Sequence, residues 1–167
     1  DCVPKAVLDL LVSYQRRGLV VWLELGLQSA FDETLKRVNR GHGLREYEKT
    51  VIAARKLGIP VCTHLIIGLP GETERHYHAS LDTVLALGTD GLKIHPLHVV
   101  KNTMLAAEWR RGEYQPLEMA DYIRVAADLI EPGEEKFRPS TITQRNHRSG
   151  LPEARRRSPQ FPIVAGR

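Results

Sequence analysis

The sequence predicts an α/β fold in which three parallel strands alternate with helices. Three apolar runs rich in β-branched residues occur at residues 19–27, 59–67 and 91–97. The segments between them have apolar residues at helical spacing, which gives a β-α-β-α-β order. Parallel strands joined by crossover helices form either an open doubly wound sheet or an arc of a barrel, and periodicity alone does not distinguish the two.

Each expected helix has one apolar face at a spacing of three or four residues. The face residues are Val7, Leu10 and Leu11 in the first helix, Tyr47, Val51, Ala54 and Leu57 in the second, and Tyr77, Leu81, Val84 and Leu85 in the third, which begins near Thr73. Gly18 and Gly58 follow the first two helices as C-caps. After the third strand we expect a short helix at 104–111 and an amphipathic helix from Pro116 to about Ile130.

The two faces of each strand differ in polarity. Odd positions of residues 21–28 are all apolar, and the third run alternates in a similar way. The polar residues that would converge on one concave face are Glu24, Gln28, His64, Lys93 and His95. Mutually satisfied polar groups in a core would explain any one of them. Because buried charges persist only when they are paired or bound, five on three adjacent strands favour a binding site.

Composition indicates one soluble domain. The 167 residues are 42% hydrophobic and 26% charged, and no run approaches the roughly 18 apolar residues of a membrane helix. The first ten residues lack the order of a signal peptide, so we expect a cytoplasmic protein with no membrane partner. The two cysteines, Cys2 and Cys62, match no metal-binding or disulfide spacing.

A composition change divides the chain near residue 130. Residues 1–130 contain sixteen Lys or Arg and sixteen Asp or Glu, which leaves eight of the 24 basic and four of the 20 acidic residues for 131–167. That basic segment is rich in Pro and Arg and has no periodicity, so we expect a disordered tail. A shifted reading frame or a misplaced gene boundary would explain it, and the same accident would explain a missing amino-terminal half.

Two glycine-containing turns close the first two strands. Gly26-Leu27-Gln28-Ser29 ends the first, and Gly68-Leu69-Pro70-Gly71-Glu72-Thr73 ends the second and opens a helix. Glycines there let a ligand approach the backbone, and the helix start offers N–H groups to an anion. Either turn alone is equally explained by ordinary turn chemistry.

The turns occur in a longer order of motifs, which is LELGLQS at 23–29, VNRGH at 38–42 and HLIIGLPGE at 64–72. This order resembles the radical S-adenosylmethionine (radical SAM) superfamily, and within it a YhcC-like bacterial branch related to the Elongator catalytic subunit and to oxygen-independent coproporphyrinogen oxidase. The resemblance covers residues 1 to about 130. It implies half of a partial (βα)6 TIM-like barrel, with these as its fourth to sixth strands and the helices on the outer face.

The resemblance also implies part of a SAM site. By position, Gln28 and Arg40 match residues near the methionyl and ribose groups of SAM, Glu24 faces inward on the same strand, Ile66 to Gly68 match the strand along the adenine, and the backbone near Leu97, His98 and Val99 matches the segment that bonds the adenine edge. His64 replaces the Asp or Gly of many relatives.

The cluster-binding signature of the family is absent from this sequence. In the family, Cys-x3-Cys-x2-Cys holds a 4Fe-4S cluster after the first strand, and another motif holds the SAM amino group. Neither occurs here. The resemblance therefore implies a complete enzyme that binds SAM and a 4Fe-4S cluster and generates a 5′-deoxyadenosyl radical on an unknown substrate, of which this chain would be an inactive fragment.

Other interpretations remain open. The chain could be a non-catalytic remnant or interaction module whose basic tail contacts RNA or an acidic partner, and its exposed strand edges could self-associate. The Elongator relation makes RNA conceivable for the intact family member by analogy. A phosphate-binding barrel enzyme could use His64 and His95 as acid and base. A histidine metal site is disfavoured, because His76 and His78 lie two apart on an expected helix.

Overall fold

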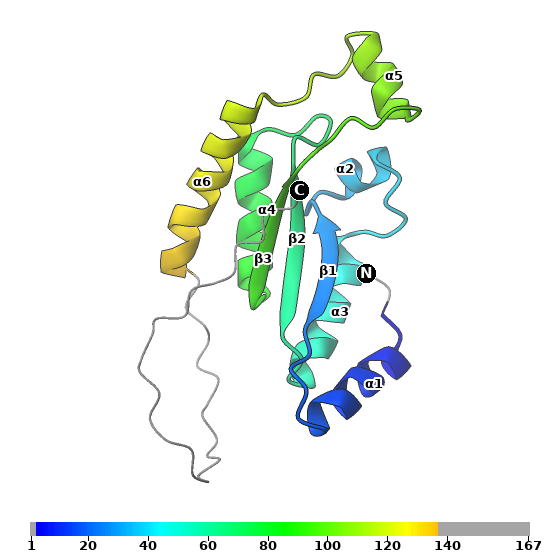
Figure 1. The fold of residues 1–167 in the computed structure, drawn as a ribbon, viewed down its shortest axis with the longest axis vertical. Coiled ribbons are helices and arrows are strands. Elements are labelled where there is room, and N and C mark those ends of the chain that lie inside the picture. Colours follow the sequence, from blue (N-terminus) through cyan, green and yellow to red (C-terminus); the bar gives the residue numbers. More distant parts are fainter. Residues whose placement is uncertain (1–2, 137–167) are drawn as a thin grey trace.

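The fold contains three parallel strands and six helices within residues 3–136, which are the residues described by the computed structural model. The strands are β1 (Leu23–Gln28), β2 (Val61–Ile67) and β3 (Gly91–Pro96), in the spatial order β1-β2-β3. The helices are α1 (Lys5–Arg16), α2 (Asp32–Arg37), α3 (Leu44–Lys56), α4 (Glu74–Ala86), α5 (Met104–Arg110) and α6 (Met119–Lys136) (Figure 1). The predicted parallel α/β arrangement is confirmed.

The core lies between one face of the sheet and helices α3, α4 and α6. Helices α3 and α4 lie behind the sheet, and α6 runs beside α4 (Figure 1). The buried residues shared by these elements are Leu25, Leu27, Val61, Leu65 and Ile67 of the strands and Tyr47, Val51, Ala54, Tyr77, Leu81, Val84, Val125 and Leu129 of the helices. The predicted apolar faces of the strands and of α3 and α4 are thus largely confirmed, although Leu57 is exposed after α3.

The start of β1 differs from the sequence prediction. The apolar run was expected to be a strand from residue 19, but β1 begins at Leu23, where pairing with Val61 begins. Because Val61 is the first residue of β2, residues before Leu23 have no strand beside them, and Val20 and Trp22 are exposed. The first helix also presents a different face: Leu8 is buried, whereas Val7 and Leu10 are exposed.

Helix ends follow the predicted glycine and capping signals in most places. Gly18 and Gly58 adopt φ angles of +84° and +70° directly after the C-cap residues of α1 and α3. Thr73 is the N-cap of α4, as expected. Helix α6 begins at Met119, three residues after Pro116, and continues to Lys136 instead of ending near Ile130. The prediction of a disordered tail otherwise concerns residues 137–167, which lie outside the described residues.

The described part of the chain contains no candidate membrane-spanning helix. None of the six helices between residues 3 and 136 combines the length and the hydropathy that a bilayer-spanning helix requires.

Candidate functional site

The carboxyl ends of the three strands bring the predicted ligand-binding residues to one edge of the sheet. Gln28 pairs with Leu65 at the end of β1, Gly68 directly follows β2, and Leu97 directly follows β3. Leu97 donates its N–H to the carbonyl of Ile67 at 2.9 Å, so the β2–β3 ladder extends to this edge. We call Gln28, Arg40, Gly68 and Leu97 the strand-end site. Ligands of parallel α/β folds bind at this edge because the connecting loops there are free to vary.

Gly26 forms a cradle for two of these side chains. A β-carbon added at Gly26 would lie 2.5 Å from Nε2 of Gln28 and 3.0 Å from a terminal nitrogen of Arg40. The Arg40 guanidinium donates to the carbonyl of Gly26 at 2.6 Å. A β-bulge between Gly26 and Gln28 and a φ of +73° at Gln28 turn the amide toward the glycine. Glycine is therefore required for the close approach of the amide and the guanidinium.

Arg40 reaches β1 because of the tight loop that follows α2. The N–H of Arg40 bonds the carbonyl of Leu35 at 2.9 Å, and Asn39 adopts a left-handed φ of +54°. Asp32, the first residue of α2, accepts the N–H of Leu44 at 2.8 Å and thereby joins the starts of α2 and α3. These contacts direct Arg40 back toward the end of β1.

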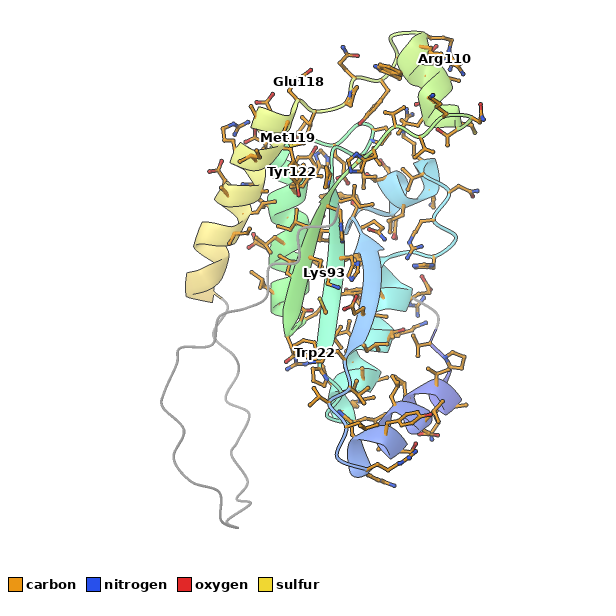
Figure 2. The ribbon with its side chains drawn as sticks, in the orientation of Figure 1. Trp22, Lys93, Arg110, Glu118, Met119 and Tyr122 are labelled. Carbon is orange, nitrogen blue, oxygen red and sulfur yellow. The ribbon has the colours of Figure 1, made fainter. Side chains whose placement is uncertain are left out.

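A second set of polar residues lies on the same face of the sheet, in the middle of the strands and away from their carboxyl ends. Lys93 donates to both carboxylate oxygens of Glu24 at 2.7 Å, and Nε2 of His64 lies 3.1 Å from Oε2 of Glu24. The ring centroids of His64 and His95 are 5.2 Å apart. We call these four residues the mid-strand cluster; Figure 2 labels Lys93 on the sheet. The register explains the cluster, because His64 pairs directly with Lys93.

The charges of the mid-strand cluster shift the pKa values of its members. The hydrogen bond from Lys93 holds the pKa of the Glu24 carboxyl below its usual value, and Glu24 raises the pKa of Lys93. Burial, together with the charges of His64 and Lys93, lowers the pKa of His95. At neutral pH the cluster therefore contains an ion pair beside a neutral imidazole at position 95.

The predicted convergence of five polar residues is thus divided into two groups. Glu24, His64, Lys93 and His95 meet in the mid-strand cluster, whereas Gln28 faces Gly26 and Arg40 at the strand end. Ile66 lies partly exposed between the two levels, on β2. His98, predicted to contribute its backbone, is exposed two residues beyond β3.

Sequence reasoning missed the side chains that brace the strand ends. Ser29, fully buried after β1, donates to Glu72 at 2.5 Å and also accepts the N–H of Phe31 at 3.0 Å. Burial raises the pKa of the Glu72 carboxyl, although hydrogen bonds from Ser29 and Thr34 oppose that rise. Glu72 thereby ties the loop after β2 to the loop after β1. The GLPGE motif contained Glu72, but nothing in the sequence indicated its partner.

Two tyrosine hydroxyls bond the backbone of Gly68. The N–H of Gly68 donates to the Tyr77 hydroxyl at 3.1 Å, and Tyr114 donates to the carbonyl of Gly68 at 2.9 Å. An added β-carbon at Gly68 would lie 3.6 Å from both Leu97 and Leu117, and the residue has a φ of +96°. The polar groups of this buried glycine are therefore engaged within the protein, and Leu97 and Leu117 pack against its Cα.

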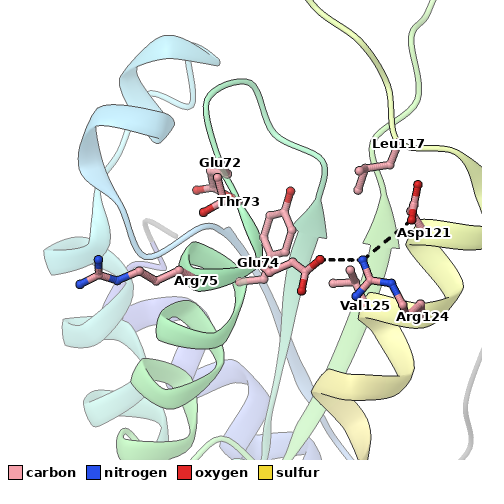
Figure 3. Close-up of a pocket in the computed structure, with 9 residues that line it drawn as sticks. Glu72, Thr73, Glu74, Arg75, Leu117, Asp121, Arg124 and Val125 are labelled. Atoms are coloured by element: carbon pink, nitrogen blue, oxygen red, sulfur yellow. Dashed lines mark hydrogen bonds and ion pairs between the residues drawn. The ribbon is translucent and has the colours of Figure 1, made fainter.

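A separate pocket of about 390 Å³ opens between the amino-terminal ends of α4 and α6 (Figure 3). Arg124 spans it, with a nitrogen 2.6 Å from Glu74 and 3.8 Å from Asp121. Its charge is therefore already balanced by the carboxylates that line the same pocket. This pocket brings together none of the predicted site residues.

The described residues contain no metal centre. Within residues 3–136, no three His, Cys, Asp or Glu side chains are close enough to hold a metal ion. Cys62 is a buried free cysteine, and burial raises the pKa of its thiol. The His76 ring accepts the N–H of Thr73 at 3.1 Å as part of the α4 cap.

Two family models match this chain. The model described as the Radical SAM superfamily matches residues 3–84, and the model described as the Radical_SAM C-terminal domain matches residues 89–158. The second match runs past residue 130, so the sequence beyond that position resembles the family at least in part. The predicted boundary near residue 130 stays a prediction.

Relatives in sequence include bacterial and archaeal proteins. Protein YhcC of Escherichia coli (strain K12) is 49% identical over 130 residues, which cover 78% of this chain and 42% of that protein. A tRNA uridine(34) acetyltransferase of Methanocaldococcus infernus is 33% identical over 106 residues, covering 62% of this chain and 20% of that protein. The chain spans less than half of the length of the curated relatives that it matches.

Solved structures show the same fold. The archaeal Methanocaldococcus infernus Elp3, solved with an amino-terminal deletion, superimposes with a TM-score of 0.66 and 26% identity over 75% of this chain and 29% of that one. Coproporphyrinogen III oxidase (HemN) of Escherichia coli superimposes with a TM-score of 0.58 and 20% identity over 77% of this chain and 30% of that one, which supports the fold alone. These likenesses confirm the predicted TIM-barrel-like arrangement of the strands and helices.

Proposed function

Because the chain belongs to the radical SAM superfamily, we propose that it supplies the carboxyl-terminal part of the SAM site in a complete radical SAM enzyme. The observation that carries this proposal is the Gly26 cradle, in which glycine leaves room for the Gln28 amide and the Arg40 guanidinium at the strand ends. An amide and a guanidinium are suited to ribose hydroxyls and to a carboxylate, and SAM has both.

Each of the other predicted residues is assigned to one part of SAM. Arg40 would bind the methionyl carboxylate and Gln28 the ribose, while Ile66 and Gly68 would line the adenine. The backbone from Leu97 to His98 would bond the adenine edge. Gly68 fits this role because Tyr77 and Tyr114 already occupy its N–H and carbonyl, so these two groups do not compete for the polar edge of the adenine.

The 4Fe-4S cluster does not fit the residues of this chain. Its two cysteines, Cys2 and Cys62, lie far apart in sequence, and no metal-holding group occurs among residues 3–136. We therefore propose that the cluster ligands lie elsewhere in a complete enzyme and that this chain alone does not cleave SAM. In radical SAM enzymes, cluster-bound SAM supplies a 5′-deoxyadenosyl radical that abstracts hydrogen from the substrate.

The mid-strand cluster would form the polar floor beneath this site. Glu24 would hold Lys93 and His64 in fixed positions through the hydrogen bonds of 2.7 and 3.1 Å. Since the pKa of His95 is lowered, its imidazole would be neutral and able to accept a proton from a bound substrate. In this proposal Glu24 and His64 contact the part of SAM that extends below the strand ends.

RNA is the proposed substrate class, by analogy with the relatives. One relative is described as a tRNA uridine(34) acetyltransferase, and others are Elongator complex protein 3 of Schizosaccharomyces pombe and Dictyostelium discoideum. A non-catalytic interaction module is the second candidate. It is favoured by the exposed apolar residues Val20 and Trp22 beside β1, which offer a surface to another chain.

The test uses the intact protein that contains this chain, reconstituted with iron and sulfide without oxygen. We expect SAM binding by equilibrium dialysis and, with dithionite, release of 5′-deoxyadenosine. Gln28→Ala and Arg40→Gln should each lower SAM affinity at least tenfold, a change of about 1.4 kcal/mol, and leave the melting temperature nearly unchanged. His64→Ala should also leave the melting temperature nearly unchanged while binding is lost.

Wild-type protein that assembles a cluster but binds no SAM would refute the enzyme proposal and favour the interaction module.

A further inference from the structure

The peptide of Gly68 is held from both sides by buried phenols. Tyr77 is 6% exposed and accepts the Gly68 N–H, while Tyr114 is 8% exposed and donates to the Gly68 carbonyl. Burial raises the pKa of both phenols, so both stay protonated at neutral pH and Tyr114 keeps its donor. The two side chains come from α4 and from the segment between α5 and α6, so the contact joins distant parts of the sequence.

Gly68 needs such a constraint because of its backbone. Glycine is the residue with the widest conformational freedom, and a φ of +96° is one of many it can adopt. Without the two hydroxyls, its carbonyl and N–H would be free to turn toward the strand-end site. A ligand would then meet a variable pattern of donors and acceptors at this position.

The neighbours of Gly68 pack closely against its Cα. Leu97 and Leu117 both lie 3.6 Å from the position of an added β-carbon, and Leu97 is fixed by its hydrogen bond to Ile67. The orientation of the Gly68 peptide therefore affects how Leu97 and Leu117 pack at the carboxyl ends of β2 and β3. In the proposed SAM site the adenine lies against these strand ends.

We infer that Tyr77 and Tyr114 are positioning residues for the adenosyl group, which they do not contact, and that they act by fixing the Gly68 peptide. This inference rests on the proposed function. It gives the segment between α5 and α6 a part in nucleoside recognition, because Tyr114 belongs to that segment.

The experiment compares two ligands on the intact, cluster-loaded protein. SAM contains both the adenosyl and the methionyl groups, whereas 5′-methylthioadenosine lacks the carboxylate that Arg40 would bind. Tyr77→Phe and Tyr114→Phe should each weaken both ligands by the same factor, about tenfold, because a buried group of Gly68 loses its partner. Arg40→Gln should weaken SAM and leave 5′-methylthioadenosine unchanged.

Tyr122→Phe is the matched control. Tyr122 donates from α6 to the carbonyl of Ile94, at 3.2 Å, in the middle of β3. Its loss removes a similar phenol-to-strand hydrogen bond away from Gly68, so both affinities should stay within twofold of wild type. Affinities are measured at a temperature at which circular dichroism shows all variants folded.

The outcomes separate the two claims. If wild type binds SAM but Tyr77→Phe and Tyr114→Phe bind both ligands as Tyr122→Phe does, the positioning role is wrong and the SAM site stands. A loss confined to SAM would also overturn it, since the phenols would then act on the methionyl end. If wild type binds neither ligand, the proposed function fails and the inference fails with it.

Discussion

At the scale of single residues, the absence of a side chain at position 26 has a testable effect. Gly26→Ala would place a methyl group 2.5 Å from the Gln28 amide and 3.0 Å from the Arg40 guanidinium. Both are ends of flexible side chains that can move at little cost. We expect SAM affinity to fall at least tenfold with a change in melting temperature of about 2 °C or less.

Gly91→Ala is the contrasting variant. Its β-carbon would lie 3.2 Å from the sulfur and 3.3 Å from the β-carbon of buried Cys62. We expect it to lower the melting temperature and to leave SAM affinity unchanged. Equal effects of Gly26→Ala and Gly91→Ala on affinity would contradict the cradle.

Tyr47 gives a prediction for alkaline stability. Burial raises the pKa of its phenol to about 12, from an unfolded value of 10.0. The stability that depends on the protonated phenol is therefore complete below pH 10 and is lost as the pH rises to about 12. Tyr47→Phe should be about 1 kcal/mol less stable at pH 8, because its hydrogen bond to Thr63 is lost. Urea titrations should show this deficit narrowing above pH 10, and a constant deficit would count against the shifted pKa.

Individual contacts were predictable where strand alternation determines them. Glu24, His64 and Lys93 were expected on one face, and their register brings them into contact. The bonds from Tyr114 to Gly68 and from Ser29 to Glu72 depend on the paths of loops. Those paths follow from tertiary packing, and neither residue belongs to a periodic pattern that would reveal its partner.

At the scale of elements, Glu72 connects the loops that end β1 and β2. The raised pKa of its carboxyl means that the folded state favours the protonated form. Stability from this group is complete below the unfolded pKa of 4.5 and decreases as the pH rises through the folded value. Glu72→Gln keeps an acceptor for Ser29 and has no charge, so it should melt at a higher temperature than wild type at pH 7.

The pH profile supplies the control for this variant. As the pH falls through 4.5 the wild-type carboxyl becomes protonated in both states, and the melting temperatures of wild type and Glu72→Gln should converge progressively. Differential scanning calorimetry from pH 4 to pH 8 would measure both curves. A variant that is less stable at pH 7 would show that the charge of Glu72 holds the two loops together.

Helices with several apolar residues at helical spacing were predictable from the sequence, and short helices were not. Helices α3 and α4 have three or four apolar face residues each and were expected near their observed positions. Helix α2 has six residues, DETLKR, with Leu35 as its one apolar side chain, so no period exists to detect. The position of Arg40 depends on this helix, which is why its approach to β1 could be assigned from the family resemblance but not from periodicity.

At the scale of the whole molecule, both outer strands of the described sheet have an unpaired edge. The order β1-β2-β3 leaves β1 and β3 with one strand neighbour each, and Val20 and Trp22 beside β1 are 89% and 47% exposed. The isolated chain should therefore self-associate as its concentration rises. Val20→Lys with Trp22→Lys should shift sedimentation velocity profiles toward monomer, and Met104→Lys, which alters an exposed residue on α5, should not.

The global architecture required more than sequence periodicity. Alternation predicted a polar face, which is partly exposed in the described sheet, but an open sheet and a barrel arc have the same β-α-β-α-β order. The choice between them came from the order of the motifs at 23–29, 38–42 and 64–72, and the solved relatives agree with it. Periodicity shows which residues are buried. It does not show whether further strands pair with the edge of β1, and closure of a barrel depends on that pairing.

The backbone at Gln28 has a consequence for selection. Residues other than Gly and Asn rarely adopt a left-handed φ, and a residue such as Gln adopts +73° at a cost of about 1–2 kcal/mol. Random variants sorted only for protease resistance should accumulate Gly or Asn at this position. The same variants sorted for retention on an adenosyl resin should keep Gln. A difference between the two pools in the residue found at position 28 would show that ligand binding and stability favour different residues there.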